Sequence, residues 1–147
     1  MSPFRPIRRL SLLAASSVLL ASASVACGSD GPTQPSSVAG AYVATTFRVA
    51  PAGQSTIDVL AGGGTLSINI AADNSTTGSL TLPASLAGST TSLSMAGTAV
   101  VSGSTIKFQQ TADTFVRDLT FTISGNTLSA TNQTAGGATF SVTLTKQ

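Results

Sequence analysis

The sequence lacks the side chains on which most enzyme active sites depend. Its 147 residues include no histidine, no glutamate and no tryptophan, a single cysteine, and only 8% charged residues. Without histidine there is no imidazole to act as a general acid or base or as a metal ligand. A single cysteine forms neither an internal disulfide nor a Cys-x-x-Cys site, and no Gly-x-Ser-x-Gly nucleophile motif is present. We therefore expect no enzyme activity, no cofactor and no metal site.

The basic character of the chain comes from its first nine residues. The formal charge is +2 and the isoelectric point is about 9.2, values that invite a nucleic-acid partner. Three of the seven cations, however, are Arg5, Arg8 and Arg9. The other four are scattered along residues 27–147, where five aspartates give a net charge of −1. No basic stripe exists there, so the sequence predicts no nucleic-acid partner.

Residues 1–26 have the pattern of a secretory signal peptide. Residues 1–9 are basic and lack acidic groups, and residues 10–26 are uncharged and rich in Leu, Ala, Val and Ser. A basic segment followed by a short apolar segment is typical of a cleaved signal. A membrane-spanning helix needs about 20 strongly apolar residues, more than this segment offers. We expect residues 1–26 to be removed.

The single cysteine stands where this signal peptide should end. Ala23-Ser24-Val25-Ala26-Cys27 resembles the lipobox of bacterial lipoproteins, although that pattern favours Leu where this chain has Ser24. The resemblance implies a lipid on the Cys27 thiol and an anchor in a membrane of the bacterial cell envelope, with Gly28 favouring the outer membrane. Ser24 and Ala26 also suit an ordinary signal peptidase, so secretion remains an alternative. Residues 27–39 would then be the lipidated cysteine and a flexible, Gly-, Ser- and Pro-rich tether.

Residues 40–147 alternate apolar with hydroxyl-bearing side chains, a period of two that is typical of half-buried antiparallel strands. The alternation predicts eight strands, over residues 41–50, 65–71, 77–82, 93–101, 105–110, 117–124, 127–132 and 138–146. Turn-forming residues predict tight hairpins at 72–74, 102–103 and 125–126, and longer connections at 51–64, 83–92, 111–116 and 133–137.

This alternation of connections predicts an up-and-down barrel. In such a meander every second connection lies at the same end, so tight turns would close a base and longer loops would surround a mouth. Eight strands form a barrel that is either filled by side chains or holds one small ligand. The fold class predicted is therefore all-β, an eight-stranded antiparallel barrel, and a two-sheet sandwich remains the alternative.

The predicted barrel resembles the lipocalin-like (calycin) domains of small bacterial lipoproteins over residues 40–147. Gly40-Ala41-Tyr42 is similar to the Gly-x-Trp motif that opens the first strand of that family. The resemblance implies that Tyr42 pairs with a cation from the last strand, Lys146, at the barrel base. Because Tyr42 alternates out of phase with Val43 and Phe47, an inward Tyr42 requires a β-bulge or a different inner face.

Two functions follow from such a barrel. The first is binding of a small apolar or amphipathic ligand by the inward side chains, namely Ile68, Ile70, Leu80, Leu82, Phe108, Phe121, Phe140 and Val142. The second is a filled barrel that binds no ligand and acts as a structural or protein-interaction module of the cell envelope.

Two loop segments are candidates for the barrel mouth. Leu60 follows Val59 in a segment that forms either a helical lid or a cap on the core. Phe115 and Arg117 would present an aromatic ring and a cation to an anionic, lipid-like ligand. Alternatively, Arg117 forms an ion pair with Asp113 or Asp118 and Phe115 packs into the barrel rim.

Overall fold

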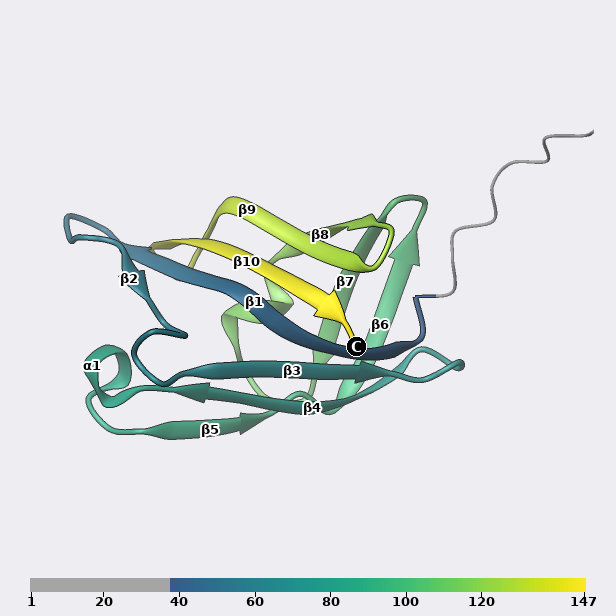
Figure 1. Ribbon diagram of the computed structural model, residues 1–147, viewed down its shortest axis with the longest axis horizontal. Coiled ribbons are helices and arrows are strands. Elements are labelled where there is room, and N and C mark those ends of the chain that lie inside the picture. Colours follow the sequence, from purple (N-terminus) through teal and green to yellow (C-terminus); the bar gives the residue numbers. More distant parts are fainter. Residues whose placement is uncertain (1–37) are drawn as a thin grey trace, which may run out of the picture. The chain divides into compact units, whose positions relative to one another are not determined.

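The computed structural model describes residues 38–147, whose regular secondary structure is almost entirely β-strand (Figure 1). The strands are β1 (Gly40–Pro51), β2 (Ile57–Asp58), β3 (Thr65–Ile70), β4 (Ser75–Leu82), β5 (Thr91–Ser94), β6 (Gly97–Ser102), β7 (Thr105–Gln110), β8 (Thr120–Ser124), β9 (Thr127–Ala135) and β10 (Ala138–Lys146). A one-turn helix α1 (Ala84–Ala87) and a 3-10 helix (Phe115–Arg117) interrupt the longer connections. Cys27 and the predicted signal and tether lie outside the described residues.

The fold class predicted from the sequence is confirmed. Eight strands form a closed antiparallel barrel in the order β1-β3-β4-β6-β7-β8-β9-β10, and the pairing of β10 with β1 closes it. The two additional short strands extend the sheet, β2 beside β1 and β5 beside β4. Closure leaves a single barrel, so the sandwich alternative was wrong.

The three predicted hairpins fold as the turn residues require. Asn74, Gly103 and Gly125 all adopt positive φ, at 65°, 57° and 55°. These turns lie together at the end of the barrel where β1 starts and β10 finishes (Figure 1). The longer connections between β1 and β3, between β4 and β5 and between β7 and β8 lie at the opposite end, which we call the mouth.

Three predicted boundaries were wrong. The predicted strand 93–101 is two strands, because β5 pairs with Ser79–Leu82 of β4 whereas β6 pairs with Ser75 and Thr76. The predicted strand 117–124 begins only at Thr120, since the 3-10 helix occupies Phe115–Arg117. The connection predicted at 133–137 is a tight turn at Gly136 and Gly137, and β9 continues to Ala135.

A β-bulge in β1 turns Tyr42 into the barrel. The register between β1 and β10 shifts between Ala44 and Thr46. Tyr42 and Ala44 are therefore buried before the bulge and Phe47 after it, whereas Val43 is 41% exposed. The bulge is the irregularity that an inward Tyr42 required.

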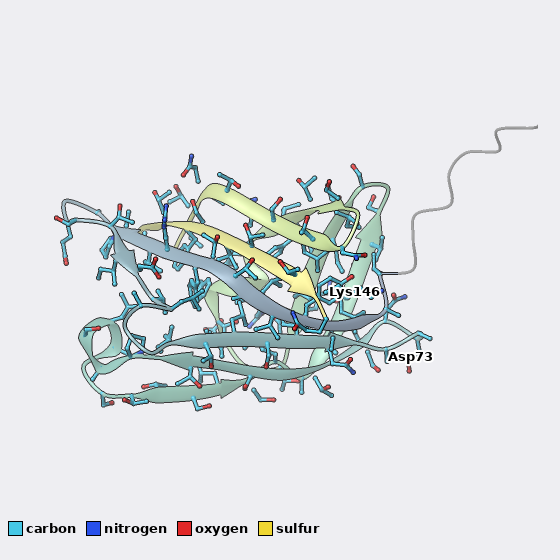
Figure 2. All side chains as sticks on the ribbon, in the orientation of Figure 1. Asp73 and Lys146 are labelled. Carbon is cyan, nitrogen blue, oxygen red and sulfur yellow. The ribbon has the colours of Figure 1, made fainter. Side chains whose placement is uncertain are left out.

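Two charged residues, Lys146 and Asp73, lie at the base end of the barrel (Figure 2). Tyr42 lies opposite Lys146 in the pairing of β1 with β10. The Tyr42 hydroxyl donates a hydrogen bond to the Val38 carbonyl at 2.9 Å. Burial raises the pKa of the Tyr42 phenol. The Asp73 carboxylate accepts hydrogen bonds from the Ser75 hydroxyl (2.6 Å) and backbone N–H (2.9 Å), which lower the pKa of Asp73. These bonds form the side-chain-to-backbone turn that closes the β3–β4 hairpin.

Candidate functional site

The side chains predicted to line a ligand cavity form the packed interior of the barrel. The exposed fraction is 0% or 1% for Ile68, Ile70, Leu80, Phe108, Phe121 and Val142, and 7% for Phe140. A side chain beside a water-sized void would keep accessible surface, so neighbouring side chains fill the space around these residues. The Phe108 and Phe121 rings meet edge to face, with centroids 5.3 Å apart. The side chains predicted to line a ligand cavity therefore lie together, but they form the hydrophobic core of the barrel.

At the mouth, residues of the β1–β3 connection and of the end of β4 pack against the core. Val59 is completely buried, and its N–H donates to the Phe47 carbonyl at 2.9 Å. Leu60 and Leu82 are half-buried and pack against the core. After the short strand β2, residues 59–63 form hydrogen-bonded turns, in which the Gly62 N–H donates to the Asp58 carbonyl at 3.2 Å. The burial of Val59 in the core agrees with the core-capping alternative.

Phe115 and Arg117 separate at the barrel rim. The Phe115 ring stacks on Phe140, with centroids 4.2 Å apart and planes at 10°, and lies 5.6 Å from the ring of Phe47. Arg117 is exposed and forms an ion pair with Asp113, with 3.1 Å between Nη1 and Oδ1. The aromatic ring thus packs into the rim, and the cation points to a carboxylate, as the ion-pair alternative predicted.

Three polar side chains are buried in the barrel, those of Thr76, Gln110 and Thr114. The Thr76 hydroxyl donates to the Met95 carbonyl at 2.9 Å. Gln110 and Thr114 are 5% and 7% exposed, and within residues 38–147 neither the Gln110 amide nor the Thr114 hydroxyl has a hydrogen-bond partner. We did not predict these residues from the sequence, although Gln110 follows Ile106 and Phe108 at the same inward spacing.

A groove on the outside of the barrel was also missed. It has a volume of about 440 Å³ and lies across the outer faces of β1, β10 and β9. Neighbouring strands contribute outward residues in three rows, in which Thr46 faces Thr143, Arg48 faces Ser141 and Ala50 faces Thr139. Thr56, Thr131 and Asn132 complete the lining. Each residue by itself has the signature of an ordinary solvent-facing position, so no local pattern predicts the groove.

A second bulge shapes one wall of this groove. The register between β9 and β10 shifts between Phe140 and Val142, which leaves Thr131 and Asn132 opposite Ser141. Asn132 has a φ of 51°. The Asn132 N–H donates a hydrogen bond to the Ser141 hydroxyl at 3.1 Å. The Ser141 hydroxyl in turn donates a hydrogen bond to Asn132 Oδ1, also at 3.1 Å. This reciprocal pair fixes the bulge.

Arg48 is the charged residue of the groove lining. Its Nε lies 3.9 Å from Asp58 Oδ2, beyond hydrogen-bond distance. The other oxygen of Asp58 accepts a hydrogen bond from the Ala61 N–H at 3.1 Å. Within residues 38–147 the Arg48 guanidinium makes no hydrogen bond, and its side chain is 61% exposed. Its N–H groups are available to a ligand.

Neither a metal site nor a membrane-crossing helix is found in the described part of the chain. Residues 38–147 contain no group of three or more His, Cys, Asp or Glu that could hold a metal ion. None of the helices in this range has the length and apolar character needed to cross a membrane. Comparison of the chain with family models, with curated proteins and with solved structures finds no match.

Proposed function

We propose that this chain is a non-enzymatic envelope protein whose filled β-barrel acts as an interaction module through its outer surface. The observation that carries the proposal is the nearly complete burial of the side chains in the barrel interior. Leu80, Phe121 and Leu128, from three different strands, have no exposed surface at all. An interior packed to this density has no room for a second molecule unless side chains move, which small barrels resist.

A lipid on Cys27 would hold this module at a membrane. The tether of residues 28–39 would span roughly 40 Å at full extension and about 20 Å on average. It joins the barrel at Gly40, beside the tight hairpins of the base. A tether of this length would leave the outer wall accessible to partners in the envelope.

The anchor is tested with Cys27→Ser. We expect this variant to lose incorporation of labelled fatty acid and to leave the membrane fraction, because the thiol is the only side chain of its kind in the chain. Ser24→Leu is the matched control, since it supplies the residue that the lipobox favours and should preserve labelling. Unchanged membrane retention of Cys27→Ser would contradict lipid anchoring.

An interior ligand is a second candidate, supported by a different observation. A buried amide or hydroxyl without a partner costs about 1–3 kcal/mol. The side chains of Gln110 and Thr114, close to the mouth, are buried without a hydrogen-bond partner among the described residues. A polar head group that reached them would satisfy these atoms. The closed eight-stranded barrel and the alignment of Tyr42 with Lys146 also support the lipocalin-like resemblance, which is part of this second proposal.

Native mass spectrometry of the purified chain separates the two candidates. For a filled barrel we expect only the mass of the protein and its anchor, and no shift of the melting temperature with a panel of C8 to C18 fatty acids. Cys27→Ser serves as the control here, because it carries no anchor lipid that could be mistaken for a ligand. A lipid-sized mass that persists in Cys27→Ser would contradict the filled-barrel function and support the interior ligand.

A further inference from the structure

The groove on the outer wall has a lining suited to hydroxyl groups. Threonine, serine and asparagine provide nearly all of it, and the methyl group of Ala50 is its only purely apolar side chain. Hydroxyls both donate and accept hydrogen bonds, as the hydroxyls of a sugar do. No aromatic ring and no Val, Leu, Ile or Met side chain lines the groove, so a lipid chain would find only small, separate apolar groups there. The lining therefore matches a polyhydroxylated ligand.

Arg48 adds a preference for negative charge. It stands in the middle row of the groove, facing Ser141 across the β1–β10 pairing. Because its guanidinium lies 3.9 Å from Asp58, it retains N–H groups that could bind a carboxylate or phosphate in bidentate fashion. With a neutral sugar in the groove, the guanidinium would keep only its long ion pair with Asp58.

The groove is also held in a fixed shape. The residues of its three rows lie on paired strands, in which backbone hydrogen bonds fix the spacing of the side chains. The rows are two residues apart along each strand, so the ladder is roughly 13 Å long. Asn132 keeps its left-handed backbone through the reciprocal hydrogen bonds with Ser141. Groups that are already positioned lose little freedom on binding.

We propose that this groove binds an acidic carbohydrate, a sugar chain that carries carboxylate or phosphate groups, along β10. The volume of about 440 Å³ lies within the range of small-molecule sites. Arg48 binds the anionic group, and Thr46, Ser141 and Thr143 bind hydroxyls. The inference rests on the proposed function, since both take the outer wall as the binding surface of the barrel.

Isothermal titration calorimetry of the full chain tests this inference. The probes are trigalacturonic acid for the carboxylate, glucose 6-phosphate for the phosphate, and maltotriose as the neutral comparison. We expect at least one acidic probe to bind at least tenfold more tightly than maltotriose. Arg48→Gln should weaken the binding of that probe by about 10- to 100-fold, the usual range for a hydrogen bond to a charged group. Thr143→Val, which replaces a hydroxyl with a methyl group, should weaken it by about three- to tenfold.

Lys107→Gln is the matched control. Lys107 is exposed on β7, outside the groove, and its substitution removes the same unit of charge. We expect it to leave the affinity for the acidic probes unchanged. Equal weakening by Lys107→Gln and Arg48→Gln, equal binding of maltotriose, or binding of no probe would each overturn the inference. A lipid found inside the barrel while Arg48-dependent binding persists would overturn only the filled-barrel function, so the two failures are distinguishable.

Discussion

Replacing Phe121 with alanine should lower the free energy of unfolding by about 3–5 kcal/mol. The Phe121 ring is completely buried and meets the edge of Phe108 at a centroid distance of 5.3 Å. Truncation removes the burial of the ring and leaves a void that the surrounding strands fill only in part, because each is fixed by its hydrogen bonds to two neighbours. Urea unfolding followed by circular dichroism measures the change.

Val100→Ala is the control for this substitution. Val100 is 48% exposed on β6, so the loss of its two methyl groups should cost no more than about 0.5 kcal/mol. The comparison bears directly on function, since a ring that lined a ligand cavity would already lack contacts on one side. A cost for Phe121→Ala close to that of Val100→Ala would contradict the filled interior.

The barrel was predictable because each strand has one buried, apolar face and one face of polar residues toward solvent. Along β10, Phe140, Val142 and Leu144 are buried, and the hydroxyl-bearing residues between them are not. The boundaries predicted for this strand, 138–146, are those of the structure, because turn-forming glycines precede it. Alternation and turn residues are local properties, and a sequence displays them without knowledge of the tertiary fold.

The break between β5 and β6 left no such local signal. The alternation of apolar and polar residues continues through the interruption, because the apolar residues on both sides of it fall on odd positions, namely Leu93, Met95, Ala99 and Val101. What changes is the segment of β4 that serves as the pairing partner, from Ser79–Leu82 to Ser75 and Thr76. The choice of partner is set by barrel closure, which is a property of the whole chain.

The outer-wall groove was unpredictable for the same reason. It combines residues from β1 with residues about 90 positions later in β9 and β10, and only the β1–β10 pairing brings them together. The two bulges that flank β10 depend on the same closure. By contrast, Gln110 was accessible to sequence reasoning, since a polar residue in phase with Ile106 and Phe108 marks a buried polar group.

Substitution of Gly78 by alanine should destabilise the barrel by about 3 kcal/mol or more, because two costs apply at this position. Gly78 has a φ of 135°, a conformation that residues with a Cβ rarely adopt. A Cβ there would also overlap the Ser67 carbonyl of the neighbouring strand β3. Backbone atoms of a paired strand have no alternative rotamer, so the β3–β4 pairing itself would have to shift. Thermal and urea unfolding of the variant measure the loss.

Two other glycines separate these costs. Gly53 has a φ of 73° with open space around it, so Gly53→Ala carries only the backbone cost of about 1–2 kcal/mol. Gly97 has no positive φ, but a Cβ would overlap the Gln109 carbonyl, so Gly97→Ala carries only the steric cost of about 1–3 kcal/mol. Gly78→Ala should therefore exceed both. If its cost only equalled that of Gly53→Ala, β3 and β4 would have separated without penalty, which would contradict a tightly closed barrel wall.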